Sequence, residues 1–458
     1  MQFELKNKVT LTGMSPETTK AIRQRLTIQN PAYAKAVQMG RWPGSIARYL
    51  KYYKDTQNGL ICPWGAMIEL YKICEQYGEQ INESDKRLKL DPINFTFNGT
   101  LRPYQQKVVT DVMKRNHGTL IAPTGSGKTC MGLNIISQRK QPALIICHTK
   151  ELQKQWISAI GKFLGIPADQ VGTIGGGGKP YLGNRVTVAL VQSLYSRLDD
   201  VTPYIGQVVV DECHRTPSRM FTEAVTAFPA RYRLGLTATP FRNDGLGKLI
   251  QWHIGPITGR VDKQTLLNNG NLCQAEAIFT TTGFSPVVDP SDDYSRALSE
   301  LTEDLGRNRL ICNTVKAHNG TGITLVLSDR RGHCESLACI LKNEYGIQAA
   351  VLTGKTPTKE RDHIIKDLQS GKCHYLVATG QLIGEGFDLP EIGTLALATP
   401  VKFPGRLIQY VGRALRPAPG KSKAVILDFV DGHGIFEYSA RTRWKTYIWQ
   451  GIQVTGKF

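Results

Sequence analysis

Residues 118 to 130 read GTLIAPTGSGKTC and predict a short strand, a glycine turn and a helix in direct succession. Thr119 to Ala122 is an apolar run of the kind found in buried parallel strands. The glycines in the turn from Thr124 to Gly127 let successive backbone N–H groups point into one concavity. The positive end of a helix beginning at Lys128 faces the same way. We therefore predict a phosphate-binding loop, with a chance glycine turn as the alternative.

The side chains of this loop divide between phosphates and a metal ion. Lys128 is expected to bind the β- and γ-phosphates as a point charge, and the Thr129 hydroxyl to bind Mg²⁺. The first position of the pattern holds Ala122 instead of glycine, which still leaves room for the phosphates. The expected nucleotide contacts are Ala122, Pro123, Thr124, Gly125, Ser126, Gly127, Lys128 and Thr129.

The composition indicates a folded, basic chain with a polyanionic partner. It has 458 residues, which favours about three domains, and 41% hydrophobic residues, which exclude a disordered chain. Lys and Arg number 57 against 38 Asp and Glu, for a net charge of +19. Nucleic acid is the natural partner for such an excess, although a merely soluble basic protein is the alternative.

The sequence also favours a reducing, cytoplasmic location. The ten cysteines are scattered and form no CxxC pair, which fits a reducing compartment. The start, MQFELKNKV, has no signal-peptide pattern, and no apolar run approaches the roughly 20 residues needed to span a bilayer. We expect no membrane association, and we expect a monomer, although the sequence leaves the oligomeric state open.

The pattern of strands and helices predicts an α/β protein of three domains. Residues 1–92 form a small α+β domain, in which residues 1–13 suit a strand and residues 82–90 a polar linker. Residues 93–262 and 263–458 each alternate strand and helix, which predicts two parallel sheets covered on both faces. Only the first of these lobes carries a phosphate loop, and this suggests a nucleotide cleft between them.

The N-terminal domain combines basic and aromatic residues. Residues 1–54 hold ten Lys and Arg against Glu4 and Glu17, and aromatic side chains lie among them. Basic and aromatic groups together suit phosphates and stacked bases, which favours nucleic-acid binding, with Arg41, Arg48 and Lys51 as candidates. A solvated face over an aromatic core is the alternative.

Two adjacent acids follow the apolar strand Val208 to Val210. Asp211 is expected to hold Mg²⁺, directly or through water, and Glu212 to polarise the attacking water. An acid pair after a strand can instead serve as a helix N-cap. After a phosphate loop in the same lobe, however, the pair favours phosphoryl-transfer chemistry.

A second basic pair lies near the end of the chain, in QYVGRALR at residues 409–416. Arg413 and Arg416 are three residues apart, which would place them on one helix face. We predict that they reach the γ-phosphate from the second lobe, as arginine fingers do. A solvated surface pair is the alternative.

Together these motifs resemble the superfamily 2 helicases of the DExH type over about residues 95–430. The resemblance implies two RecA-like parallel-sheet lobes. The matching stretches occur in family order: LRPYQ (101–105), APTGSGKT (122–129), CHTKEL (147–152), VQSL (191–194), DECH (211–214), TATP (237–240), LSDR (327–330), TG (379–380), GEGFDLP (384–390) and QYVGRALR (409–416).

The resemblance assigns further residues to the nucleotide. Arg102, Tyr104 and Gln105 match positions that recognise adenine, so the implied cofactors are ATP and Mg²⁺. Gly386 and Asp388 match a motif that lines the cleft from the second lobe. Positions that couple hydrolysis to strand movement are His214, Thr237, Thr239 and Gln409.

The resemblance also implies a grip on the backbone of one nucleic-acid strand. Hydroxyls, amides and cations suit phosphate contacts that ignore sequence. For each residue singly, a plain loop or cap role is an equally good interpretation. The matching positions are Thr149, Lys150, Gln192, Ser193, Ser328, Arg330 and Thr379.

Phage branch-migration helicases resemble this chain in layout, with a small basic domain before the LRPYQ-like stretch. Residues 29–44 and 58–60 are similar to that domain, although Pro43 stands where those proteins tend to have an acid. The resemblance implies a DNA helicase that remodels forks or junctions in replication, recombination or repair. The alternatives are an RNA-remodelling ATPase of the same superfamily and a non-enzymatic nucleic-acid-binding scaffold.

Overall fold

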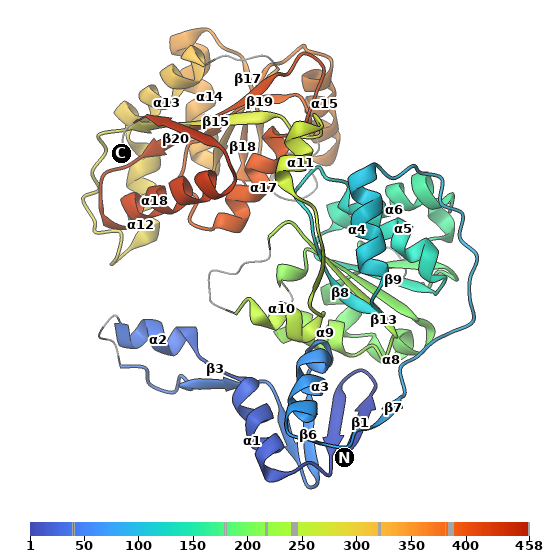
Figure 1. Cartoon of the computed structure of the whole chain (residues 1–458). Coiled ribbons are helices and arrows are strands. Elements are labelled where there is room, and N and C mark those ends of the chain that lie inside the picture. The colour runs from blue at the N-terminus through green and yellow to red at the C-terminus, as the bar shows by residue number, and fades with distance from the viewer. Residues whose placement is uncertain are drawn as a thin grey trace. The chain divides into compact units, whose positions relative to one another are not determined.

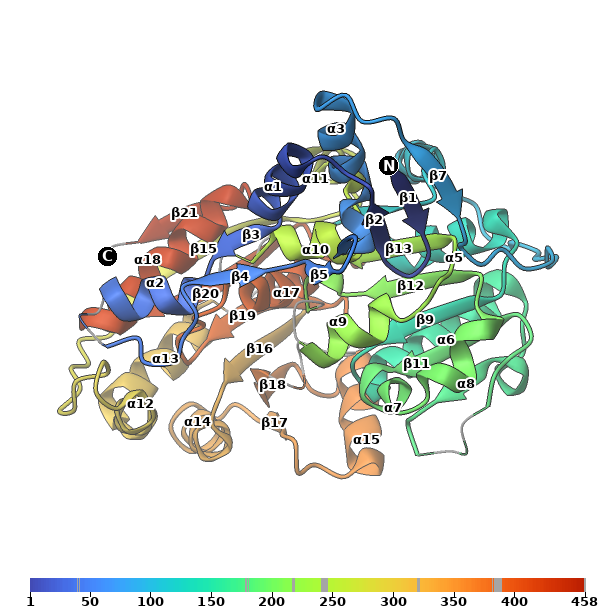
Figure 2. The same cartoon turned by 90° about the horizontal axis from the view of Figure 1, so that it is seen from below.

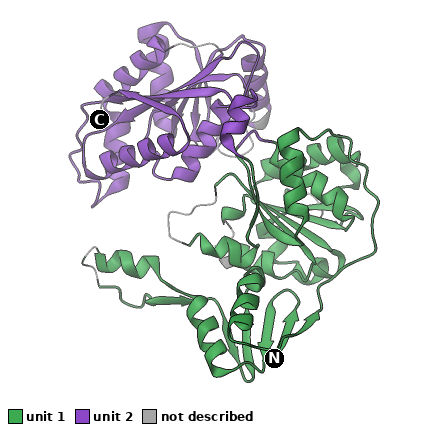
Figure 3. Ribbon diagram, viewed as in Figure 1, with its two compact units in different colours: residues 1–123, 127–261 green, residues 124–126, 262–458 purple. Residues whose placement is uncertain are grey.

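The structure is a computed structural model that describes residues 1–38, 40, 42–177, 179, 181–215, 219–239, 246–318, 322–380, 382 and 389–456. These residues form two compact units (Figure 3). The first, called unit 1, holds residues 1–123 and 127–261, and unit 2 holds residues 124–126 and 262–458. Each unit has its own parallel sheet and is described by itself.

The N-terminal region of unit 1 is a mixed five-stranded sheet with helices packed on it (Figure 1). In sheet order its strands are β5 (Lys54–Thr56), β6 (Gly59–Cys62), β2 (Val9–Thr12), β1 (Gln2–Leu5) and β7 (Asn82–Asp85). Its helices are α1 (Pro16–Arg25) and α3 (Met67–Gln76), the latter preceded by the short η1 (Trp64–Ala66).

Two details of this region correct the sequence prediction. Residues 1–13 are two antiparallel strands, β1 and β2, because the polar run from Lys6 to Lys8 forms a turn between them. The expected linker at residues 82–90 begins as strand β7, which pairs in parallel with β1. β7 is a polar edge strand held mainly by backbone pairing, so the apolar pattern that predicts strands is missing.

An arm leaves this region between α1 and β5. It consists of the two-stranded ribbon β3 (Thr27–Gln29) and β4 (Tyr49–Lys51), with helix α2 (Pro31–Gln38) between the strands. Figure 1 shows α2 and β3 extended away from α1 and the sheet. None of the residues of α2 is buried.

The N-terminal region shares its core with the lobe that follows. Leu249 and Trp252 of α10 (Lys248–His253) lie in the same buried cluster as Phe3. On the other side of the contact, Trp64 packs edge-on against His117, with ring centroids 4.5 Å apart, and lies under the guanidinium of Arg233 at 4.5 Å. The two parts of unit 1 are therefore joined by buried apolar and cation–π contacts.

The rest of unit 1 is a seven-stranded, all-parallel sheet, as predicted (Figure 2). Its strands are almost uninterrupted runs of buried residues, as expected when helices cover both faces. In sheet order they are β10 (Gly172–Ile174), β11 (Val186–Leu190), β9 (Ala143–Cys147), β12 (Gln207–Asp211), β13 (Tyr232–Thr237), β8 (His117–Ile121) and β14 (Ile257–Arg260). The helices are α4 (Pro103–Met113), α5 (Lys128–Arg139), α6 (Lys150–Leu164), α7 (Val191–Tyr195), α8 (Leu198–Val201), α9 (Arg219–Thr226) and α10, with short turns η2 (Ala168–Gln170), η3 (Thr202–Tyr204) and η4 (Cys213–Arg215).

Unit 2 is built on a second seven-stranded parallel sheet, so the predicted fold class is confirmed. In sheet order its strands are β17 (Ala349–Leu352), β18 (Tyr375–Thr379), β16 (Ile323–Ser328), β19 (Ile392–Leu397), β20 (Lys423–Val430), β15 (Gln274–Thr281) and β21 (Gln453–Gly456). Its helices are α11 (Lys263–Asn268), α12 (Tyr294–Glu303), α13 (Leu305–Ala317), α14 (Arg331–Tyr345), α15 (Thr358–Gln369), α17 (Pro404–Ala414) and α18 (Gly434–Trp449).

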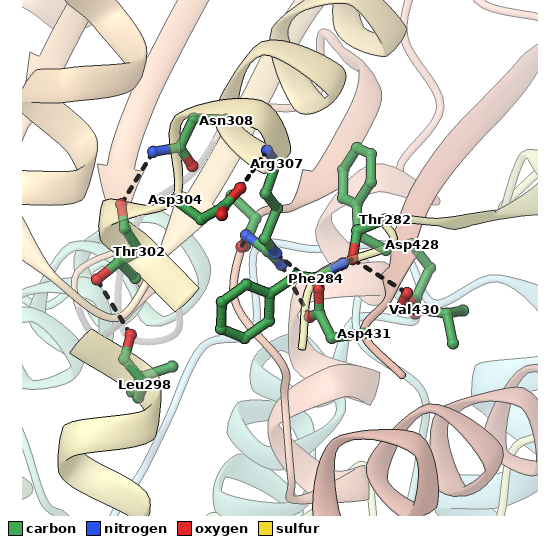
Figure 4. Close-up of polar contacts among 12 residues, drawn as sticks. Thr282, Phe284, Leu298, Thr302, Asp304, Arg307, Asn308, Asp428, Val430 and Asp431 are labelled. Carbon is green, nitrogen blue, oxygen red and sulfur yellow. Dashed lines mark hydrogen bonds and ion pairs between the residues drawn. The ribbon is translucent and has the colours of Figure 1, made fainter. Parts of the chain in front are cut away.

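Buried ion pairs tie the helices of unit 2 to the end of β20. Arg307 of α13 donates to Asp431 at 2.7 Å, and both side chains are fully buried (Figure 4). Asp431 also accepts a hydrogen bond from Thr282, 2.6 Å away. Arg443 of α18 holds Asp428 in the same way at 2.6 Å. Each carboxylate has several donors, as a buried charge requires.

None of the described helices is long and apolar enough to cross a membrane.

Candidate active site

The phosphate loop lies where the sequence predicts it, between β8 and α5. Gly125 and Gly127 have φ angles of 85° and 84°, a region that favours glycine, and α5 begins at Lys128. Gly127 is also needed for space, because a Cβ atom there would lie 2.4 Å from Nε2 of Gln105. The side chain of Gln105, on α4, is therefore packed directly against the loop.

The adenine-recognition stretch is held at the start of α4. Gln105 is buried, and its Oε1 accepts a hydrogen bond from the backbone N–H of Arg102 at 2.9 Å. Arg102 is exposed and Tyr104 is half-buried. This arrangement ties the end of the stretch to the phosphate loop and leaves two of its side chains accessible to a nucleotide.

Lys128 and Glu212 form an ion pair across two strands of the sheet. Nζ of Lys128 donates to Oε1 of Glu212 at 3.1 Å, and both side chains are largely buried. The pair forms because β8 and β12 both flank β13 and end at the same sheet edge. Ligand sites in parallel sheets lie at this edge.

Asp211 lies at the end of β12 with both carboxylate oxygens engaged. Oδ2 accepts a hydrogen bond from Nε1 of Trp156, 2.9 Å away on α6, and Oδ1 accepts one from the backbone N–H of Glu212. Burial, together with the negative charge of Glu212, raises the pKa of Asp211. Trp156 was not expected from the sequence, where its apolar spacing on α6 indicates only a core residue.

Glu212 departs from ordinary backbone geometry. Its φ is 48°, in the left-handed region that non-glycine residues rarely adopt, and this bends the chain away from the strand. Burial alone would raise the pKa of Glu212, but the charges of Lys128 and His214 outweigh burial and hold it well below its usual range. The side chain is thus an ionised carboxylate, suited to orient and polarise a water through its charge.

Polar contacts continue from the acids through His214 to the end of the next strand. Nδ1 of His214 lies 3.1 Å from the Thr237 hydroxyl and 3.2 Å from Oε2 of Glu212. Only the first of these contacts has hydrogen-bond geometry, since Oε2 is buried without a hydrogen-bond partner among the described residues. The Thr237 hydroxyl donates to the carbonyl of Thr239, so His214 must donate from Nδ1.

This arrangement fits a nucleoside triphosphate with Mg²⁺. The loop offers backbone N–H groups and a lysine, which suit phosphates, at the start of a helix. Thr129 on α5 and the carboxylate of Asp211 are hard oxygen donors, which Mg²⁺ prefers. The buried, unpartnered Oε2 of Glu212 leaves an acceptor for a water molecule.

The strand-gripping candidates of unit 1 lie after two neighbouring strands. Thr149 and Lys150 follow β9, and Gln192 and Ser193 follow β11, which pairs with β9. The Thr149 hydroxyl accepts from the N–H of Leu152 as the N-cap of α6. Lys150 and Gln192 are exposed. The four residues are therefore close together at one edge.

In unit 2, Ser328 and Thr379 are paired in register at the ends of β16 and β18. Ser328 is buried, and its hydroxyl lies 2.9 Å from Nδ1 of His333 and accepts from the N–H of Arg330. Arg330 in turn donates to Ser295. This placement favours a positioning role for Ser328 over the direct strand contact expected from the sequence.

His333 is itself held by a second buried residue. Its Nε2 lies 2.7 Å from Oδ1 of Asn308 on α13, and the Asn308 amide donates to the carbonyl of Thr302. Burial and the nearby charge of Arg307 lower the pKa of His333 to about 3, so the ring is neutral. Its single N–H goes to Asn308, and Nδ1 therefore accepts the Ser328 hydroxyl.

The arginine pair differs from the sequence prediction in one respect. Helix α17 ends at Ala414, so Arg413 lies in its last turn and Arg416 lies beyond it. The two are therefore not on one helix face, although a turn links the N–H of Arg416 to the carbonyl of Arg413. Burial lowers the pKa of Arg416. Gln409 is half-buried on α17.

Five residues that the sequence assigns to nucleic acid or nucleotide remain: some lie on the arm, and the others lie outside the described residues. Arg48 and Lys51 are exposed on the arm. Arg41, Gly386 and Asp388 lie outside the described residues.

Two protein families match the sequence. Residues 98–242 match the family described as "Type III restriction enzyme, res subunit", and residues 306–418 match the "Helicase conserved C-terminal domain". The first match spans the phosphate loop and both acids. The second includes the arginine pair.

The most similar proteins include cellular and viral helicases. The chain is 26% identical to "DNA 3'-5' translocase XPB2" of Sulfurisphaera tokodaii, over 75% of this chain and 84% of that protein. It is 24% identical to "Putative ATP-dependent RNA helicase L396" of Acanthamoeba polyphaga mimivirus, over 94% of this chain and 83% of that protein.

Among solved structures, a fragment of a putative HsdR subunit of a type I restriction enzyme from Vibrio vulnificus has the same fold. Its TM-score is 0.58 at 18% identity, over 93% of this chain and 81% of that one. The two family matches fall on the two parallel-sheet lobes and contain the residues of the candidate site. The chain thus contains the res-subunit domain and the helicase conserved C-terminal domain, which are domains of ATP-dependent helicases.

Proposed function

We propose that the protein is an ATP-driven DNA helicase or translocase that remodels forked or branched DNA. The observation that carries the proposal is the line of side chains from Lys128 through Glu212 and His214 to Thr237. It joins the phosphate loop to the strand end where family members couple hydrolysis to movement. A change at the phosphates can therefore reach the nucleic-acid edge of the same sheet.

Each residue of unit 1 has a role that its geometry supports. Lys128 and the loop backbone bind phosphates, and Thr129 and Asp211 would hold Mg²⁺, which supplies charge neutralisation. Glu212 orients and polarises the attacking water, because its carboxylate is ionised and its Oε2 makes no hydrogen bond among the described residues. Hydrolysis removes an anion next to Lys128, and the Lys128–Glu212 pair can then re-form.

Unit 2 supplies the remaining charge in this proposal. Arg413 and Arg416 act as arginine fingers on the γ-phosphate, as in related phosphoryl-transfer enzymes. By the family resemblance Gly386 and Asp388, which lie outside the described residues, would also contact the nucleotide. Closing and opening of the two lobes then moves two strand-gripping surfaces relative to each other, and each cycle advances the protein along nucleic acid.

Three features support DNA with branches as the substrate. The net charge of +19 favours a polyanion, and the XPB2 relative is named as a DNA translocase. The basic N-terminal region shares its core with the first lobe, so any DNA it holds moves with the motor. Its layout resembles that of phage branch-migration helicases.

The first test is Lys128→Ala. Nucleic-acid-stimulated ATPase should be abolished, because the phosphates lose their main cation, whereas the exposed Lys114→Ala should behave as wild type. Full activity in Lys128→Ala would refute the proposal.

ATPase and unwinding on forks, four-way junctions and plain duplexes then test the branched substrate, which should give the fastest turnover.

RNA is the second candidate, favoured by the match to a protein named as an RNA helicase over 94% of this chain. Contacts to the backbone separate the two polymers poorly, since only 2′-OH contacts distinguish them. The same panel should therefore include RNA duplexes. Stronger ATPase stimulation by RNA than by DNA would replace the DNA proposal with this one.

A further inference from the structure

The arm formed by residues 27–51 carries an almost fully exposed tryptophan. Trp42 is 90% exposed, and Tyr49 on β4 is 50% exposed. Two other aromatic residues near the arm are used for packing. Tyr52, at the base of the arm, lies 5.5 Å from the ring of Trp252, and Trp64 is fully buried. Trp42 is thus not explained by the packing of its own domain.

The arm also carries positive charge without acids. The chain has no acidic residue between Glu17 and Asp55, and eight basic residues. At the base of the arm, Arg23 and Arg25 are paired with Asp55 and Glu69 at 2.7 and 2.8 Å. Farther out, Lys35, Arg48 and Lys51 are exposed, and no described acid pairs with them.

The backbone holds the arm in a defined shape. Antiparallel pairing joins Thr27 to Lys51 and Gln29 to Tyr49. Asn30 closes the ribbon by donating its side-chain amide to the carbonyl of Ala47 at 2.8 Å, and its Oδ1 caps the N–H of Ala32. Because Tyr52 packs against Trp252, the base of the arm is fixed to unit 1.

The arm thus presents an exposed indole and cations that have no acidic partner among the described residues. These groups suit nucleic acid with exposed bases. Lysine and arginine bind phosphates without regard to sequence, and an aromatic ring stacks on any base whose face is accessible. Inside a continuous duplex, base faces are covered by their neighbours. They are accessible where a duplex opens or ends, as at a branch point.

We propose that Trp42 stacks on the terminal base pair or the first unpaired base at a DNA branch point, while Lys35, Arg48 and Lys51 hold the adjacent phosphates. The proposal rests on the proposed function, because it gives the arm the same DNA on which the motor acts. The arm would then fix the position of the branch relative to unit 1. It would make the enzyme prefer branched DNA over plain strands.

The test uses the full-length protein and a fork with 2-aminopurine at the branch point. Stacking should quench the fluorophore when wild-type protein binds. Trp42→Ala should lose the quench and bind the fork on the order of 10-fold more weakly, since one stacked base contributes about 1–3 kcal/mol. Trp42→Phe should keep part of the quench and part of the affinity for the fork. Tyr204→Ala, an exposed aromatic residue outside the arm, serves as the control.

The same variants separate this inference from the proposed function. Affinity for a covalently closed duplex circle, in which the base faces are covered, should be unchanged in Trp42→Ala. Equal quenching by wild type and Trp42→Ala, or equal loss of affinity on forks and duplex circles, would overturn the assignment of Trp42 to the branch point. Absence of DNA-stimulated ATPase in wild type would instead overturn the proposed function. If wild type binds anionic vesicles, and Trp42→Ala loses that binding but binds the fork as wild type does, the arm binds lipid and the inference is refuted.

Discussion

Asp211 accepts a hydrogen bond from the indole of Trp156, 55 positions away in the sequence. The bond fixes one carboxylate oxygen of a residue that is expected to hold Mg²⁺. A hydrogen bond to a buried charged acceptor contributes about 1.5–3 kcal/mol, more than a neutral one. Trp156 is therefore expected to be a positioning residue for the metal site.

Trp156→Phe tests this role, because it keeps most of the ring and removes the donor. We expect the Mg²⁺ concentration for half-maximal ATPase to rise several-fold, with nucleic-acid affinity unchanged. A Mg²⁺ titration at saturating ATP measures the effect. Trp444→Phe, in unit 2, is the matched control. If Trp156→Phe lowers only the urea midpoint and leaves the Mg²⁺ titration unchanged, the indole serves packing alone.

At the scale of single residues, the sequence reveals contacts that a local pattern defines. Lys128 and Gly127 are fixed by neighbours in the same loop, and both are where the pattern places them. Trp156 could not be recognised, since its partner is on another strand and its spacing is that of any core residue. The positive φ of Glu212 has no sequence signal, because glutamate is not a residue that favours it.

At the scale of elements, a buried chain connects helix α13 to the strand-gripping edge of unit 2. It runs from Asn308 through His333 to Ser328, whose hydroxyl accepts the N–H of Arg330. The neutral ring of His333 gives each bond a fixed direction. The loop after β16 is thereby held in one conformation by two helices.

His333→Phe removes both hydrogen bonds and keeps an aromatic ring. The DNA concentration for half-maximal ATPase stimulation should rise several-fold, because Arg330 is no longer oriented, while turnover at saturating DNA stays near wild type. Arg309→Ala, on the exposed side of α13, breaks only a surface pair with Glu344 and should change neither value. An unchanged half-maximal concentration in His333→Phe would show that the chain does not support strand binding.

Elements with a buried, uninterrupted apolar run are predictable from sequence, and elements held by their backbone are not. β9 and β11 are such runs, since every residue in them is buried. β7 is polar and was expected as a linker. The end of α17 was also missed, although Pro417, three residues after Ala414, is a signal in the sequence that could have placed it.

At the scale of the whole molecule, unit 1 depends on histidines that are buried and uncharged. Burial, aided by the charges of Arg233 and its neighbours, lowers the pKa of His117 to about 3. Because this is below the value of about 6.5 in an unfolded chain, the unfolded state takes up the proton first. The contribution of neutral His117 to the free energy of unfolding is therefore complete above pH 6.5, and it is lost as the pH falls towards 3.

His117→Phe should make the stability of unit 1 less sensitive to acid, because the ring against Trp64 is kept and the titrating group is removed. For His117 alone the expected loss in wild type is about 2 kcal/mol between pH 6.5 and pH 5, at 1.36 kcal/mol per pH unit. Hydrogen exchange of peptides covering β8 measures it. The exposed His363→Gln should keep the wild-type slope, and an equal slope in His117→Phe would contradict this account.

The proposed motor needs both units to act on one nucleotide, and Arg416 tests that requirement. In this proposal the phosphate loop, Asp211 and Glu212 bind the nucleotide from one side, so Arg416→Lys should leave nucleotide affinity near wild type. Hydrolysis at saturating DNA should fall on the order of 10³-fold, because a lysine lacks the planar fork that spans two oxygens of the transferring group. Stopped-flow nucleotide binding and steady-state ATPase separate the two effects, with the exposed Arg441→Lys as control. Hydrolysis at the wild-type rate in Arg416→Lys would mean that this guanidinium does not reach the phosphates, and the movement of the second unit would then need another link to the chemistry.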